Sequence, residues 1–181
     1  MTRDEAINSL AQRDLTQLSF DKRESILLDW WSIDESDPDY ASLPDSLRAA
    51  LNRTDQPDDP GSTLYDPLLQ IALRRSYVGV LNTYLAKKLS ELGCNETVSG
   101  DVEDLNACPC CGYRSLQRSG EYDICPVCFW EDDGTVELDR ISGPNHMTLR
   151  EAILNFRTFG AVAEGAVKYV LTDGKERYGR E

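Results

Sequence analysis

Apolar side chains recur at helical spacing through the first 93 residues, a stretch that contains no cysteine. Thr2 and Glu5 have the spacing of a capping box in front of the first such segment. Asp21 is placed to cap a second helix, and Pro44 to stand in the first turn of a third. The pattern predicts an all-helical N-terminal half.

The clearest loop of this half is predicted at residues 52–63, which combine proline, glycine, aspartate and asparagine without an apolar side chain. After this loop, Asp66 and Pro67 are expected to open a long helix that ends near Gly93. Gly79 lies inside the helical pattern, where glycine costs about 1 kcal/mol relative to alanine. We interpret it as a point of close packing or a bend.

The pattern changes after residue 93, because residues 94–106 are polar and read as a connector. Further along, Thr148 and Glu151 form a second capping-box pattern before an amphipathic stretch that Gly160 is expected to end. The remainder is ambiguous, because residues 167–171 suit either a helix or a short strand. These features predict a C-terminal helix.

Five of the six cysteines lie close together in the sequence, between the connector and that helix. Cys108 and Cys111 form one Cys-x2-Cys pair, and Cys125 and Cys128 form another after thirteen residues. Two intervening residues let a tight turn present both sulfurs to one ion, and a tetrahedral Zn²⁺ takes four thiolates at about 2.3 Å. The spacing therefore predicts a structural zinc site with these four ligands.

The residues around each pair suit a knuckle turn. Proline follows the first cysteine of both pairs, and Gly112 follows the first pair, where such a turn often needs a positive φ. Phe129 follows the second pair and is expected to pack over the site. Two short strands are predicted between the pairs, around residues 113–116 and 122–124, with a turn between them.

The predicted fold class is therefore mainly α, with a small zinc-ribbon-like β-hairpin module and a C-terminal helix. The predicted domains are a helical domain at 1–93, a connector at 94–106, and the module with its helix at 107–181.

Other readings of the cysteines stay open. An iron–sulfur centre also takes four cysteines, and a disulfide pair is the alternative in an oxidising compartment. Cys110 is a further thiol that could replace a ligand or react beside the metal, and Cys94 reads as an ordinary residue. His146, the one histidine, is a further candidate ligand or base.

The net charge of −13 disfavours binding to phosphate backbones or anionic membranes and favours a basic partner. The N-terminus lacks the apolar core of a secretory signal, and no apolar run approaches the ~18 residues that span a bilayer. We therefore expect a cytoplasmic protein, in which clustered thiols favour metal over disulfides.

The stretches CPCCGYRSL, GEYDICPVCFWEDDG and GPNHMTLREAILNF together resemble the bacterial cysteine-rich CPCC family. The resemblance covers about residues 106–162 and implies a small zinc-ribbon-like module. It further implies an accessory role in bacterial loci, because some such modules are similar to immunity proteins paired with toxins. The first 93 residues resemble no family that we can name.

Three function classes follow. The first is a non-catalytic immunity or adaptor protein that binds a basic effector or toxin. Its candidate contacts are aromatic anchors with an acidic rim, namely Trp30, Asp34, Glu35, Asp37, Asp39 and Tyr40.

The second class is a zinc-containing enzyme that uses Cys110, His146 or the acids Glu131–Asp133. A closed site of four thiolates has no position for water, so we expect no enzyme activity. The third class is a nucleic-acid-binding regulator, which the acidic residues flanking the module disfavour.

Overall fold

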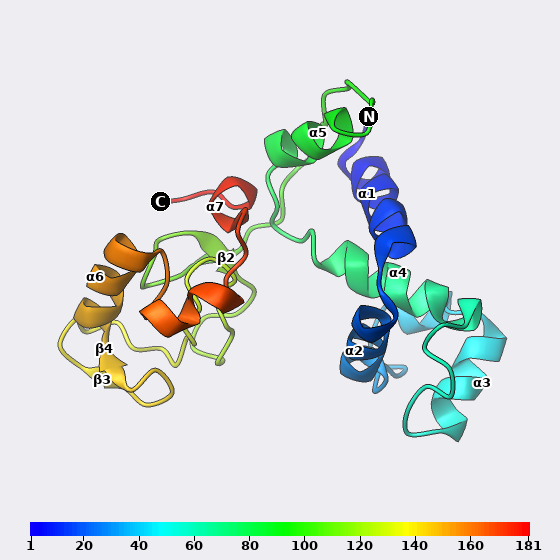
Figure 1. Ribbon diagram of the computed structural model, residues 1–181, viewed down its shortest axis with the longest axis horizontal. Helices are drawn as coiled ribbons and strands as arrows, with labels where there is room; N and C mark the ends of the chain where they lie inside the picture. The colour runs from blue at the N-terminus through cyan, green and yellow to red at the C-terminus, as the bar shows by residue number, and fades with distance from the viewer. The chain divides into compact units, whose positions relative to one another are not determined.

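The computed structural model describes residues 1–181 (Figure 1). The chain forms two compact units, and neither is continuous in sequence. Unit 1 comprises Met1–Val78 and Leu85–Ser99, and unit 2 comprises Gly79–Tyr84 and Gly100–Glu181. The protein is mainly helical, with two small antiparallel sheets and a C-terminal helix in the cysteine-containing part, so the predicted fold class is confirmed.

Unit 1 is built from helices packed around a leucine-rich core. In Figure 1, α4 lies beside α1 and α2, and it packs against both. Leu10, Leu47 and Leu68 are fully buried. The helices are α1 (Arg3–Gln17), α2 (Phe20–Trp30), η1 (Tyr40–Ser42), α3 (Asp45–Arg53), η2 (Thr63–Tyr65), α4 (Asp66–Arg75) and α5 (Asn82–Ser90), which begins in unit 2.

The first two helices are capped by side chains. The Thr2 hydroxyl accepts from the Glu5 N–H at 3.3 Å and Glu5 accepts from the Thr2 N–H at 2.8 Å, which confirms the predicted capping box. The prediction that Asp21 caps α2 is wrong. Ser19 is the cap and accepts from the Lys22 N–H at 3.3 Å, so Asp21 lies in the first turn, where its charge favours the helix dipole.

The third helix begins and ends slightly later than predicted. Pro44 is the residue before α3, not a residue of its first turn. The helix continues to Arg53, so the predicted loop starts after residue 53, at the extended Thr54.

The long helix predicted from Asp66 to Gly93 is wrong as one helix, because it consists of α4 and α5 with a break between them. At the break Gly79 has a φ of 71°, and a Cβ there would lie 2.2 Å from Leu105 Cδ1. Gly79 is therefore a point of close packing within unit 2, as interpreted from the sequence. Gly93, with a φ of 84°, follows the end of α5 as predicted.

The sheets of unit 2 are two-stranded and antiparallel. Asn106 of the first pairs with Leu116, and Ile141 of the second pairs with Thr148. The elements of unit 2 are β1 (Asn106–Ala107), β2 (Arg114–Leu116), β3 (Ile141–Ser142), β4 (Met147–Thr148), α6 (Leu149–Phe159), η3 (Glu164–Tyr169) and α7 (Gly174–Arg177).

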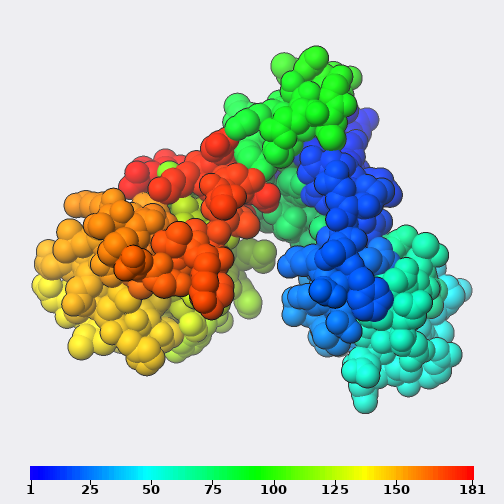
Figure 2. Space-filling model, viewed as in Figure 1, coloured from blue at the N-terminus to red at the C-terminus, as the bar shows by residue number.

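The C-terminal helix α6 has both ends that the sequence predicted. Thr148 and Glu151 form a capping box, with the Thr148 N–H donating to Glu151 at 2.8 Å. Gly160 ends the helix with a φ of 80°. The strand considered at residues 167–171 is absent, because residues 167–169 belong to η3 and a bend follows at Val170. In Figure 2, α6 and η3, in orange, lie next to each other on the visible face of unit 2.

None of the helices combines the length and the apolar composition that a bilayer crossing requires.

Candidate metal centre

Two loops of unit 2, knuckle 1 (residues 108–113) and knuckle 2 (residues 125–130), share one backbone hydrogen-bond pattern. In each, the N–H of the first cysteine donates to the carbonyl oxygen five residues later. The N–H of the residue four positions after the first cysteine donates to the carbonyl oxygen of that cysteine. Each knuckle thus has two such hydrogen bonds, and all four donor–acceptor distances are 2.8 Å. The donor–acceptor pairs are Cys108–Tyr113, Gly112–Cys108, Cys125–Trp130 and Phe129–Cys125.

The predicted hairpin between the knuckles is wrong. β2 pairs with β1, which precedes knuckle 1, and Ile124 forms a bridge with Glu131 across knuckle 2. The backbone hydrogen bonds of each knuckle join the segments on its two sides. Each knuckle is therefore the tip of a separate short hairpin. Tyr122 has a φ of 65°, so the chain turns where the second strand of the predicted hairpin would run.

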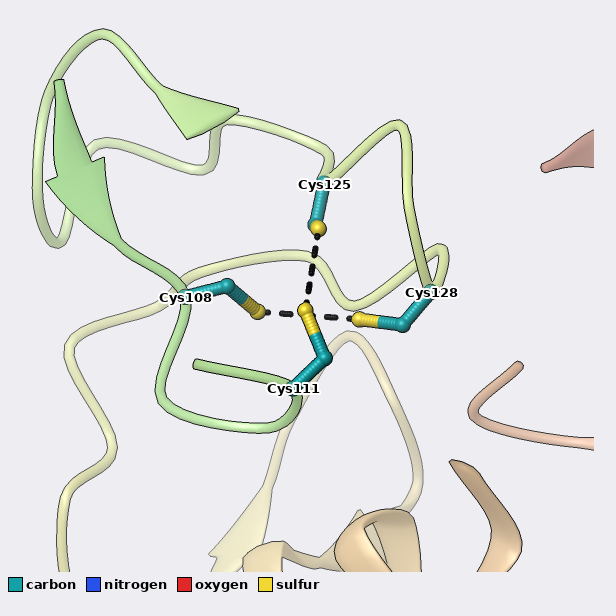
Figure 3. Close-up of side chains that lie close together, drawn as sticks. All are labelled: Cys108, Cys111, Cys125 and Cys128. Carbon is teal, nitrogen blue, oxygen red and sulfur yellow. Dashed lines mark hydrogen bonds between the residues drawn. The ribbon is translucent and has the colours of Figure 1, made fainter. Parts of the chain in front are cut away.

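The two knuckles bring four sulfurs together (Figure 3). Cys108 Sγ lies 3.6 Å from Cys128 Sγ, and Cys111 Sγ lies 3.6 Å from Cys125 Sγ. All four sulfurs lie within 4.8 Å of one another, and all four residues are buried. A tetrahedral zinc with Zn–S bonds of about 2.3 Å separates its sulfurs by roughly 3.8 Å. The cluster therefore has the dimensions of a site that could hold such an ion.

The ionisation of the thiols also suits a cation. Hydrogen bonds from Cys108, Cys111 and Cys128 lower the pKa of Cys125. Hydrogen bonding with Cys108 first, and then with Cys110, raises the pKa of Cys128. The cluster by itself therefore favours one thiolate held by neighbouring thiols. A divalent cation among the sulfurs would stabilise further thiolates, because an opposite charge favours the ionised form.

The additional candidates for this site lie outside the four-sulfur cluster. Cys110 is buried and interacts with Cys128, but its sulfur is not one of the four. His146 is exposed in the turn between β3 and β4, with a φ of 53°. Cys94 is half-buried in unit 1.

The acids after knuckle 2 hold loops together. Asp132 is buried, and its carboxylate accepts from the Gly120 N–H at 2.8 Å and the Gly134 N–H at 3.3 Å. Partial burial raises the pKa of Asp133, but hydrogen bonds led by those from Thr135 outweigh this and lower it. Both side chains therefore have structural partners within these loops.

Asn145 is a structural residue to which the sequence analysis assigned no role. Its side-chain oxygen accepts from the Glu131 N–H at 3.0 Å, and its Nδ2 donates to the Glu131 carbonyl at 2.8 Å. It also donates to the Ser142 hydroxyl at 2.6 Å. The amide thus joins the β3–β4 turn to Glu131, directly after knuckle 2. The signal was present in Gly-Pro-Asn at the start of the stretch GPNHMTLREAILNF.

Several contacts hold the last cysteine of each knuckle and its surroundings. The carbonyl of Cys128 accepts from the Val162 N–H at 2.7 Å, and that of Cys111 accepts from Arg180 Nε at 3.1 Å. Phe129 stacks on Tyr169, with ring centroids 5.1 Å apart. Residues after α6 therefore brace both knuckles from outside.

Ser115 is the second residue that the sequence analysis missed. Its hydroxyl oxygen lies 3.2 Å from Cys125 Sγ, and the residue is buried on β2. The only available signal was its position two residues after the end of knuckle 1.

The predicted partner surface lies in unit 1, and its residues differ in exposure and in the partners that they contact. Tyr40 is buried in the core, so it is not available as an exposed anchor. Asp37 and Asp39 accept from Arg75 at 2.6 and 2.7 Å. Arg75 also lies over the Trp30 ring, 5.2 Å from its centroid. Much of the expected acidic rim is therefore neutralised within the chain.

Asp34 and Glu35 remain as exposed acids of that surface, and Trp30 is half-buried beside them. Asp34 accepts from the Ser36 N–H at 2.9 Å. A hollow of about 320 Å³ lies at this point. Its lining residues are Asp29, Trp30, Ser32, Ile33, Asp34, Ser36 and Asp37.

The family model described as Cysteine-rich CPCC matches residues 106–176, which confirms the resemblance found in the sequence and extends it beyond α6. No curated protein and no solved structure matches the chain.

Proposed function

We propose, from the premise that residues 106–176 form a cysteine-rich CPCC domain, that the chain is a non-catalytic zinc-binding module that binds a basic protein. The observation that carries the metal part is the cluster of four buried sulfurs within 4.8 Å of one another. Four soft thiolates in tetrahedral reach of one point favour Zn²⁺ among the available divalent ions.

Zinc in such a site would be structural. The four thiolates of Cys108, Cys111, Cys125 and Cys128 would complete the tetrahedron, which leaves no position for water or substrate. The ion would join knuckle 1 to knuckle 2, so its binding free energy would contribute to the folding of unit 2. This favours a scaffold over an enzyme.

The proposal of a basic protein partner rests on the charge of this protein. The net charge of −13 gives the protein a field that attracts cationic surfaces and speeds their association. Exposed Asp34 and Glu35 beside the Trp30 hollow offer an acidic rim with an aromatic side chain. A basic bacterial effector or toxin has the complementary charge, so an immunity or adaptor role is the function that we propose.

The metal part is tested by elemental analysis of the protein purified without added metal. We expect one zinc per chain and no visible absorption band. A coloured protein with iron, or a protein that contains no metal and binds none when zinc is added, contradicts the proposal.

The proposal of a basic protein partner is tested by affinity capture from cells of the source organism. We expect wild-type protein to retain one dominant basic protein, and the double variant Asp34→Asn/Glu35→Gln to retain less of it. The matched control is Asp21→Asn/Glu24→Gln, which removes the same charge from exposed positions of α2. Equal loss in both variants would mean that only the overall charge matters, and retention of no basic protein would contradict the role.

A further inference from the structure

Ser115 connects the two knuckles at the sulfurs. It lies on β2, directly after knuckle 1, and its hydroxyl oxygen is 3.2 Å from the sulfur of Cys125 in knuckle 2. Among the hydrogen bonds of the four sulfurs, it supplies the one hydroxyl group. The contact is therefore specific to one of the four cysteines.

The Ser115 hydroxyl has two acceptors for its single proton. The Tyr113 carbonyl oxygen lies at 3.4 Å, which is long for an O–H···O bond, since these are usually about 2.7–2.8 Å. Cys125 Sγ lies closer, at 3.2 Å, although sulfur is the larger atom. A metal-bound Cys125 is a thiolate and can only accept. The Ser115 hydroxyl then donates its hydrogen bond to Cys125 Sγ.

We propose that Ser115 is a positioning residue for the metal, donating a hydrogen bond to the Cys125 thiolate that orients this ligand and reduces its nucleophilicity. This inference rests on the proposed zinc site. The residue is buried, so the hydrogen bond is shielded from competing water. Hydrogen-bond partners of this kind orient metal ligands, and their loss typically lowers metal affinity about 10- to 100-fold.

The four cysteine ligands should therefore differ in their reactivity towards an alkylating reagent. Cys128 has no hydroxyl partner at its sulfur, whereas Cys125 has one. A thiolate attacks iodoacetamide by forming an S–C bond while iodide leaves, and the attacking sulfur gives up its bond to zinc. Because the hydrogen bond stabilises the electron pair that attacks, Cys125 should be the more protected of the two.

The test compares Ser115→Ala with wild type and with Ser115→Thr, which keeps a hydroxyl. Ser142→Ala is the matched control, since Ser142 is also buried in unit 2 but bonds Asn145 and no sulfur. Zinc affinity is measured by competition with a chromogenic chelator. Alkylation of each cysteine in the zinc-loaded protein is followed by peptide mass spectrometry.

We expect Ser115→Ala to bind zinc about 10- to 100-fold more weakly and Ser115→Thr to recover most of the loss. In Ser115→Ala, the alkylation of Cys125 should accelerate severalfold relative to that of Cys128. Equal acceleration at all four cysteines would mean a loosened fold and would overturn the positioning role. Unchanged affinity and alkylation would overturn it while leaving the zinc site intact, whereas a wild-type protein that binds no zinc overturns both proposals.

Discussion

Gly112 and Phe129 occupy equivalent positions in the two knuckles, and both have left-handed backbones, with φ values of 75° and 70°. Each donates its N–H to the carbonyl of the first cysteine of its knuckle. Glycine adopts this conformation without cost, whereas a side chain pays roughly 1–2 kcal/mol. Knuckle 2 therefore holds a strained residue, and the stacking of Phe129 on Tyr169 offsets part of that strain.

This relationship predicts an unusual order of stability at Phe129. Phe129→Ala loses the ring contact and keeps the strained backbone, whereas Phe129→Gly loses the contact and relieves the strain. We expect the glycine variant to be more stable than the alanine variant by about 1 kcal/mol. Urea unfolding of the zinc-loaded proteins measures the difference. A Phe129→Ala variant at least as stable as Phe129→Gly would show that the left-handed turn is not retained.

A second prediction concerns the metal ligands. Cys125→Ser should release zinc, and the melting temperature of unit 2 should fall, because structural zinc contributes roughly 10 kcal/mol of binding free energy in small modules. Exhaustive chelation of the wild type should have the same effect. Elemental analysis and thermal melting followed by circular dichroism provide the measurements.

Cys110→Ser is the matched control, because Cys110 is buried beside the cluster but is not one of its four members. It should keep one zinc per chain. Loss of zinc from Cys110→Ser with retention by Cys125→Ser would reassign the ligands.

A third prediction concerns the break between α4 and α5. Gly79→Ala should destabilise the protein by more than about 2 kcal/mol, because the new methyl group would overlap Leu105 and the left-handed backbone would become strained. Gly93→Ala is the control. Its φ is also positive, but no atom lies within 4 Å of the added Cβ, so only about 1 kcal/mol is expected. Equal effects at the two glycines would contradict the close packing.

A fourth prediction concerns pH. Burial, and then the hydrogen bond to Asp173, raise the pKa of Tyr84 from 10 to about 12. The folded state therefore favours the neutral phenol. Its contribution is fully present below pH 10 and is lost as the pH rises towards 12. We expect Tyr84→Phe to cost about 1 kcal/mol at pH 8 and less near pH 12.

Urea unfolding of both proteins between pH 8 and pH 12 checks this prediction. A constant difference between wild type and Tyr84→Phe across that range would show that the hydroxyl is not held by Asp173.

Local sequence signals predicted the features that depend on few residues. The capping boxes at Thr2 and Thr148 and the glycine that ends α6 need only neighbours within one helical turn. The grouping of the four cysteines followed from their spacing, since two-residue gaps restrict how far apart the sulfurs lie.

Features that depend on distant residues escaped prediction. The sequence marked Gly79 as a point of close packing or a bend, but it did not reveal that Leu105, from a later segment, is the residue that packs there. The contact of Ser115 with Cys125 and the pairing of Asp39 with Arg75 likewise join residues far apart in the sequence. No periodicity encodes such partners, so the pairing of the acidic rim with Arg75 appeared only in three dimensions.

Residues 79–84 are assigned to unit 2, although the segments on both sides of them are assigned to unit 1. The Leu81 N–H donates to the Arg177 carbonyl at 2.8 Å, so this short stretch is tied to the chain's last residues. The polypeptide consequently changes units three times, and no single cut separates the two intact. A fragment that starts at residue 100 would lack residues 79–84, which are part of unit 2. Dissecting this protein therefore requires supplying residues 79–84 again, by circular permutation or as a grafted peptide.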